Sequence, residues 1–233
     1  MQTERMDFCM VACQDRIYAI GGTILEPVQD TKELHNNRTK VLDTMECYKP
    51  FSNTWKPCAR LIKPVSHCKG ACVDGKVYVM DSATGCLQRY VPSSDKWQFL
   101  GRLHQCRKVH AVLSWQGCCY VLLSEAGCHT SCAHLYMYSE QAKALELAAP
   151  CVRLSNTKVI TAAVVYHNIV VIVITGGVRV WDGRDWGKTC RTVGHCYGEK
   201  ADETCHRTSP LQPFVLRIPR FLLKTTNNYL KIP

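Results

Sequence analysis

The sequence predicts an all-β protein built from repeated four-stranded units, and three observations carry this prediction. Short apolar segments rich in β-branched residues alternate with turns that contain Gly, Asn, Asp or Pro, as antiparallel hairpins require. A step of seven residues separates Tyr48 from Trp55 and recurs between Tyr90 and Trp97. The two tryptophans lie 42 residues apart. A period of about 40 to 50 residues with four short strands is typical of propeller blades.

Four segments of the chain show this order of elements. In each, an apolar strand ends at a short polar turn and a second apolar strand follows. A third strand carries an aromatic residue, and after another turn a fourth strand opens with tryptophan, or with Leu145 in the third segment. The predicted blades span approximately 5–62, 63–104, 105–150 and 151–188. Residues 189–233 are a divergent tail, with the alternative that this tail completes a blade.

Residues that recur at equivalent positions are expected to form the framework of the blades. Paired glycines end the second strand of the first and fourth units, where the backbone turns without a clash at Cβ. Tyrosine and tryptophan on adjacent strands are expected to pack across their hairpin. The framework residues are Gly21, Gly22, Tyr48, Trp55, Tyr90, Trp97, Gly176, Gly177, Trp181 and Trp186. Asp81-Ser82 and Ser124-Glu125 stand at the glycine positions of the two middle units.

This pattern resembles the kelch repeat, and the tyrosine, seven-residue step and tryptophan are most similar to kelch-like proteins of the BTB–kelch family. The resemblance covers about residues 5–188. It implies a kelch β-propeller, of which about four blades are recognisable here, where six are usual in that family. The alternatives are an incomplete or divergent propeller, or a tail that completes a blade. Because no BTB or BACK region precedes Met1, the chain is expected to be a C-terminal fragment or a short isoform.

The resemblance also implies a partner-binding rim, formed by two sets of loops. One set follows the glycine positions, and the other precedes the first strand of each blade. Cations in the second set would favour an acidic or phosphorylated partner segment, whereas the alternative is that they are solvated loop charges. The predicted rim residues are Thr23, Ser82, Thr84, Ser124, Glu125 and Arg179 in the first set, and Lys63, Ser66, His67, Arg107, Lys108, Asn156 and Lys158 in the second.

A polar insertion at 23–40 lengthens the first unit. Connections longer than about 12 to 15 residues are commonly functional or disordered. Its mixed charge favours neither a specificity loop nor a flexible surface loop.

Composition excludes several classes of protein. The chain has 233 residues, of which 46% are hydrophobic and 21% charged, so it can bury a core of useful size. Its net charge of +10 is diffuse and is poor support for nucleic-acid binding. The apolar stretch 159–175 is interrupted at His167 and Asn168, so no membrane span is expected. The N-terminus lacks the apolar region of a secretory signal, so a cytoplasmic protein is expected.

The 16 cysteines are expected to be reduced thiols that fill the core, since no secretory signal accompanies them. Two groups, at 128–134 and 190–206, contain several cysteines and histidines. Neither has the paired spacing of a structural zinc site, so no metal or other cofactor is predicted, with zinc as the alternative. No catalytic motif occurs, and no enzyme activity is predicted.

The function that follows is a protein-interaction module. By resemblance, it would be the substrate-recognition propeller of a BTB–kelch adaptor for a cullin-3 E3 ubiquitin ligase. Cullin-3 itself would bind only through the missing BTB region. The alternative is an actin-binding kelch scaffold, since a basic surface suits an acidic filament.

Overall fold

The computed structural model of the protein describes residues 1–26, 38–103, 106–125, 132–153, 159–166, 168–175, 177–184 and 186–187. These residues form strands, turns and one short 3-10 turn at Pro50–Ser52. Within the described ranges, no helix has the length and apolar character needed to cross a membrane. The prediction of an all-β protein is confirmed.

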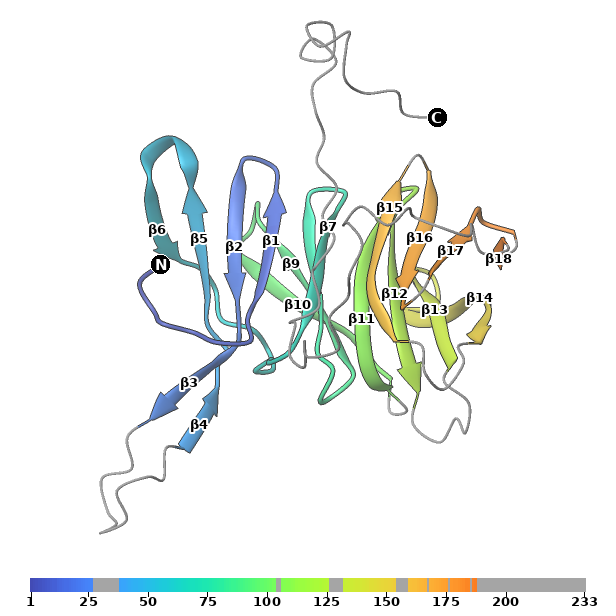
Figure 1. The fold of residues 1–233 in the computed structure, drawn as a ribbon. Coiled ribbons are helices and arrows are strands. Elements are labelled where there is room, and N and C mark those ends of the chain that lie inside the picture. The colour runs from blue at the N-terminus through green and yellow to red at the C-terminus, as the bar shows by residue number, and fades with distance from the viewer. Residues whose placement is uncertain are drawn as a thin grey trace, which may run out of the picture.

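Four antiparallel four-stranded sheets follow one another along the chain (Figure 1). The first contains β1 (Cys9–Cys13), β2 (Arg16–Ile20), β5 (Met45–Lys49) and β6 (Thr54–Pro57). The second contains β7 (Lys69–Val73), β8 (Lys76–Met80), β9 (Cys86–Val91) and β10 (Lys96–Arg102). The third contains β11 (Cys106–Trp115), β12 (Cys118–Glu125), β13 (Cys132–Ser139) and β14 (Ala144–Arg153). The fourth contains β15 (Ile160–Tyr166), β16 (Ile169–Ile174), β17 (Gly177–Trp181) and β18 (Trp186–Gly187). This is a four-bladed propeller arrangement.

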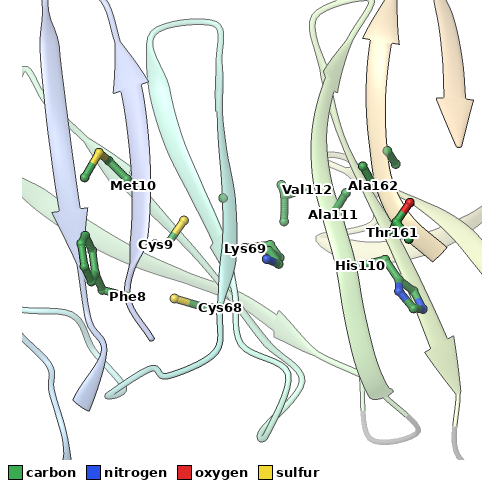
Figure 2. Close-up of a pocket in the computed structure, with 12 residues that line it drawn as sticks. Phe8, Cys9, Met10, Cys68, Lys69, His110, Ala111, Val112, Thr161 and Ala162 are labelled. Atoms are coloured by element: carbon green, nitrogen blue, oxygen red, sulfur yellow. The ribbon is translucent and has the colours of Figure 1, made fainter. Parts of the chain in front are cut away.

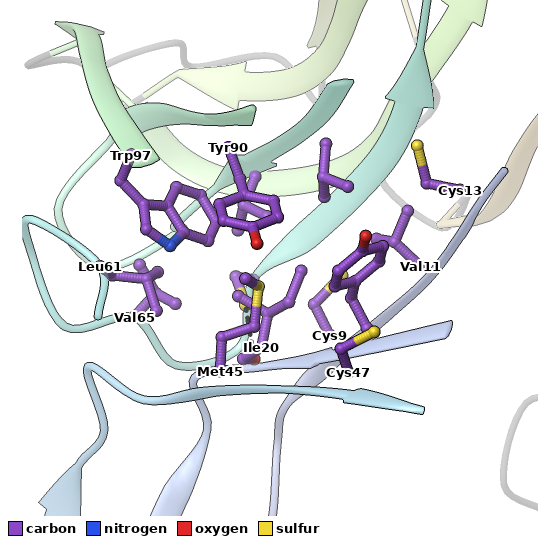
Figure 3. Close-up of a cluster of buried hydrophobic side chains, with 14 residues drawn as sticks. Cys9, Val11, Cys13, Ile20, Met45, Cys47, Leu61, Val65, Tyr90 and Trp97 are labelled. Carbon is purple, nitrogen blue, oxygen red and sulfur yellow. Dashed lines mark hydrogen bonds between the residues drawn. The ribbon is translucent and has the colours of Figure 1, made fainter. Parts of the chain in front are cut away.

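The blades pack face to face, and each junction has its own core. The first core joins blades one and two and includes Val11 and Tyr18 from one blade and Val79 and Tyr90 from the next (Figure 3). Two further cores join blade two to blade three and blade three to blade four. The strands β1, β7, β11 and β15 are the inner strands, because each contacts the inner strand of the neighbouring blade.

The tyrosine and tryptophan framework is built as the sequence predicts. Tyr48 lies directly opposite Trp55, and Tyr90 lies directly opposite Trp97, across adjacent strands. Their ring centroids are 5.1 and 5.3 Å apart. In the fourth blade, Trp181 takes the place of the tyrosine and pairs with Trp186. The fourth-strand tryptophans also bind the preceding blade, since Trp97 Nε1 donates to Ala59 O (3.0 Å) and Trp186 Nε1 donates to Pro150 O (2.6 Å).

The paired glycines of the first blade lie where the chain passes close to the next segment. Gly21 has φ +60 and Gly22 has φ +95, and a Cβ at Gly21 would collide with Val65. Gly22 N donates to Val65 O (2.8 Å). Gly176 lies outside the described residues, and Gly177 begins β17.

Asp81 occupies the corresponding glycine position in the second blade and is almost wholly buried. Its carboxylate accepts hydrogen bonds from Ser66 N (3.1 Å) and from Thr84 N (2.8 Å) and Thr84 Oγ1 (2.6 Å). The side chain thereby holds two loops together. This explains how a blade forms here without the glycine pair.

The insertion at 23–40 begins and ends as a two-stranded hairpin. Its arms are β3 (Thr23–Glu26) and β4 (Arg38–Val41), which extend away from the first blade (Figure 1). An exposed ion pair joins Lys40 Nζ to Glu26 Oε1 (2.8 Å). Residues 27–37 lie outside the described residues, so the choice between a specificity loop and a flexible loop stays open.

The N-terminal segment covers the face of the first blade that points away from blade two. Arg5 forms a buried ion pair with Glu46 (2.7 Å) and donates to Gly21 O (2.9 Å). Gln2 N and Thr3 N also donate to the Glu46 carboxylate. Burial alone would raise the pKa of Glu46, but the bonds from Gln2, Arg5 and Thr3 together lower it.

One expectation about cysteines is wrong. Cys13 and Cys72 form a disulfide between β1 and β7, and their Cα atoms are 5.2 Å apart. The inner strands of neighbouring blades lie side by side, which brings these two residues within the range that a disulfide requires. Most of the other cysteines whose side chains the structure describes are buried, as expected for core residues.

We expect Trp97→Ala to lower the free energy of unfolding by about 3–5 kcal/mol, because it removes a buried ring and the hydrogen bond to the preceding blade. The measurement is urea denaturation followed by circular dichroism. Phe99→Ala is the matched control, since Phe99 lies on the same strand and is 47% exposed. It should cost less than about 1 kcal/mol. Equal losses for the two variants would contradict the packing role of Trp97.

We expect reduction of the Cys13–Cys72 disulfide to lower the free energy of unfolding by about 4 kcal/mol, because the bond closes a loop with a sequence separation of 59 residues. Urea denaturation with and without dithiothreitol measures the difference. The double variant Cys13→Ser with Cys72→Ser should show the lower stability in both conditions. If the free energy of unfolding of the wild-type protein is the same with and without dithiothreitol, the expectation is wrong.

Candidate functional site

Two adjoining cavities open where the inner strands begin. The rim cavity has a volume of about 660 Å³ and is lined by Asp7, Phe8, His67, Cys68, Lys69, Ser82, Lys108 and Val109. The inner cavity has a volume of about 420 Å³ and shares Phe8, Cys68 and Lys69 with the first. Figure 2 shows side chains of β1, β7, β11 and β15 around the inner cavity, among them Lys69, His110 and Thr161.

Three of the predicted rim residues meet at the rim cavity. His67 comes from the loop before β7, Ser82 from the loop after β8, and Lys108 from the start of β11. Ser82 Oγ donates to His67 O (3.3 Å) and accepts from Val109 N (3.0 Å). Hydrogen bonds therefore fix the loops of the second blade against the inner strand of the third.

Charge is distributed unevenly around the rim cavity. Lys69 and Lys108 are exposed and come from neighbouring inner strands. His67 Nδ1 lies 3.6 Å from Asp7 Oδ2, and His67 N donates to Asp7 O (3.0 Å). The cavity therefore offers two lysine ammonium groups beside the ring of Phe8, with one carboxylate at its edge.

The other predicted rim residues that the structure describes do not line the rim cavity. Four of them serve the framework through hydrogen bonds, because loops that turn tightly need partners for their backbone groups. Thr23 pairs with Met6, the backbone of Lys63 binds the buried Gln88 amide, and Ser66 and Thr84 bind Asp81. Asn156 and Lys158 lie outside the described residues.

Loops of both predicted rim sets are shorter than expected, because the neighbouring strands extend into them. Arg107, Lys108, Ser124 and Glu125 lie within β11 and β12, because these strands continue to pair as far as Cys106 opposite Glu125. Thr23 begins β3, and Arg179 lies in β17 opposite Ile172. The expectation that these residues sit in loops is corrected, although Lys108 still lines the rim cavity.

Sequence reasoning missed Phe8 and Lys69. Both lie at the start of an inner strand, which is the rule that selected His67 and Lys108. The predicted loop set before the inner strands did not include the first blade, where Asp7 and Phe8 precede β1. In the second blade it ended at His67 and did not include Lys69, the first residue of β7. The signal was therefore present in the sequence.

His110 on β11 lines the inner cavity and shares a hydrogen bond with Ser124 (Nε2 to Oγ, 2.8 Å). Burial lowers the pKa of His110 to about 4, with further lowering from the charges of Lys108 and Lys69. The imidazole of His110 is therefore neutral near pH 7.

Cys68 lines both cavities. A hydrogen bond with Cys9 and burial both raise the pKa of its thiol, which therefore stays protonated. Among the residues that the structure describes, no group of three or more His, Cys, Asp or Glu side chains could hold a metal ion. The sequence segment 190–206, with its cysteines and histidines, lies outside that part of the chain, as does most of 128–134.

We expect the fold to lose stability as the pH falls from about 6.5 towards 4, because the folded chain disfavours the protonated form of His110. A histidine whose pKa is lowered by folding contributes its full stabilisation above the pKa that it has in the unfolded chain. That stabilisation is lost as the pH falls through the pKa that it has in the folded chain. The loss from this residue should reach about 3 kcal/mol, and His110→Gln should remove it. Denaturation at several pH values measures it, and an NMR titration midpoint near 6.5 for His110 would contradict it.

Comparison with known proteins shows similarity to kelch proteins. A kelch motif matches residues 4–62. The chain is 28% identical over 86 residues to Kelch-like ECH-associated protein 1B of Danio rerio, covering 37% of this chain and 13% of the relative. It is 27% identical over 130 residues to Kelch-like protein 26 of Danio rerio, covering 52% of this chain and 19% of the relative.

Two further proteins extend the comparison. An F-box/kelch-repeat protein of Arabidopsis thaliana is 28% identical over 127 residues, covering 52% of this chain and 32% of the relative. The chain thus spans about a third or less of each of these relatives. A crystal structure of an extracellular domain from B. thetaiotaomicron matches the fold with a TM-score of 0.50 at 14% identity, covering 80% of this chain and 23% of that one. The kelch motif at residues 4–62, the similarity to proteins named as kelch proteins and the stacked four-stranded sheets agree with one another.

Proposed function

We propose that this chain is a protein-interaction module that binds an acidic segment of a partner protein at the rim cavity. Kelch repeats indicate a protein-interaction module. The observation that supports an acidic partner is the convergence of Lys69 and Lys108, from two different blades, beside Phe8. The volume of the cavity lies in the range of pockets that enclose a ligand.

The chemistry of the rim cavity suits a short peptide with carboxylates and an apolar side chain. Ammonium groups form charge-assisted hydrogen bonds with carboxylates, which are stronger than neutral ones. Phe8 and Val109 offer apolar contact beside these charges. Asp7 would repel a carboxylate placed near it, so the position of the acidic groups along the partner would matter.

The finer proposal is that the rim cavity selects the substrate of a BTB–kelch adaptor for a cullin-3 E3 ubiquitin ligase. It is supported by the two relatives named as kelch-like proteins. In such an adaptor, the propeller would hold the substrate while the BTB region binds the cullin. This chain spans 13% and 19% of the length of those two relatives, so the role of a whole adaptor is a proposal for it.

We expect Lys69→Glu with Lys108→Glu to weaken partner capture at least about tenfold, because the change replaces two attractive charges with two repulsive ones. The measurement is quantitative affinity capture from cell extract with mass spectrometry. The control pair is Lys56→Glu with Lys96→Glu, which changes the net charge equally at two exposed lysines outside the rim cavity. Equal losses for both pairs would mean general electrostatic attraction, and no loss for either would exclude the rim cavity.

The same experiment separates the adaptor from a scaffold. A form of the protein extended upstream of residue 1 should capture cullin-3 together with the proteins that depend on Lys69 and Lys108. Capture of actin by both forms, without cullin-3, would favour the cytoskeletal scaffold and overturn the adaptor.

A further inference from the structure

Each blade that has a following neighbour presents an aromatic side chain to it. The residue is a tyrosine, and it is the third residue of the second strand of the blade. It contacts an aromatic residue on the third strand of the next blade. The pairs are Tyr18 with Tyr90 (5.6 Å between ring centroids), Tyr78 with Tyr138 (6.5 Å) and Tyr120 with Trp181 (5.9 Å). We call the side of a blade that carries this tyrosine its forward face.

The fourth blade has a forward face of the same kind. Tyr166 and Ile169 flank the turn between β15 and β16, so Val171 stands where the other blades have tyrosine. Along β16, Ile172 and its alternate neighbours are buried against the third blade. Successive side chains of a strand point to opposite faces, so Ile169, Val171 and Val173 point away from the third blade.

The centre of this forward face is apolar. Val171 and Val173 of β16 pair with residues of β15 and β17 that lie on the same face. These paired residues are all apolar and only partly buried. They are Ala162, Val164, Val178 and Val180. A sheet face that meets water normally carries polar residues. None of the described strands packs on this face, and β15–β18 stand at one end of the row of blades (Figure 1).

The opposite end of the row shows how an end face is covered by the chain itself. There the segment around Arg5 lies over the first blade, and it forms an ion pair and hydrogen bonds with the carboxylate of Glu46. At the fourth blade, β18 is the outermost strand of its sheet and ends at Gly187. The chain therefore leaves the blade at its edge, with 46 residues still to follow. That length matches one blade, since blade equivalents are 42 residues apart.

We propose that the C-terminal segment 188–233 packs on the forward face of the fourth blade, with the stretch Phe214–Leu223 supplying the apolar contacts. This stretch carries Phe214, Leu216, Ile218 and Phe221 within eight residues. It supplies the aromatic rings that every other forward face receives from its neighbour. The inference concerns the architecture of the array and does not rest on the proposed function of the rim cavity.

The direct test places the photo-crosslinking residue p-benzoylphenylalanine at position 171 of the full chain. An aromatic side chain suits this position, because the equivalent residues are tyrosines. The expected product is a crosslink within one chain to a peptide containing residues 213–224, identified by mass spectrometry. A crosslink between two chains would show that a second copy covers the face and would overturn the proposal. So would a crosslink to another part of the same chain, or none at all.

The control for crosslinking carries the same residue at position 51. Phe51 is fully exposed at the turn between β5 and β6, far from the fourth blade in the sequence order. We expect no crosslink from position 51 to 213–224. Equal crosslinking from both positions would show that the segment contacts surfaces indiscriminately, which would also overturn the proposal.

A second test uses the hydrophobic dye ANS, which reports exposed apolar surface. Leu216→Asp with Ile218→Asp should increase dye fluorescence at least about threefold, because an apolar sheet face would lose its cover. Arg217→Asp with Arg220→Asp is the matched control in the same stretch and should leave the fluorescence nearly unchanged. Circular dichroism checks that both variants retain their strands. An unchanged signal from the first pair, or equal increases from both, would refute the proposal.

Discussion

The structure depends on the packing of one apolar sheet face against the next. A four-stranded sheet with apolar residues on both faces cannot satisfy them within itself, so each blade needs a neighbour. At each junction, a tyrosine of one blade contacts an aromatic ring of the next, and Trp97 and Trp186 add hydrogen bonds to the blade before. These contacts set the spacing of the blades and therefore the positions of the inner strands.

The rim cavity is a consequence of that packing. Its lining comes from the starts of three inner strands and the loops beside them, so it exists only when three blades are stacked. Asp81 and Ser82 hold these loops through hydrogen bonds to backbone groups of other segments. A surface assembled in this way is preorganised, so little conformational entropy is lost when a partner binds.

The sequence located the candidate site in part. His67, Ser82 and Lys108 were found because their positions relative to the repeat are regular, and the same rule extends to Phe8 and Lys69. It could not distinguish residues that line the cavity from residues whose loops are tied to the framework. Thr84 and Lys63 belong to the second group, because their partners Asp81 and Gln88 are buried polar residues. The local pattern does not show where those partners lie.

The sequence by itself determined the all-β class, the four units and the pairing of Tyr48 with Trp55 and of Tyr90 with Trp97. These features repeat at fixed short spacings, and strand alternation acts over the same short range. Only the tertiary structure decided that Cys13 meets Cys72 and that the fourth blade presents an apolar face without a described neighbour. Both depend on how separate sheets stack, which brings together residues that no local period relates.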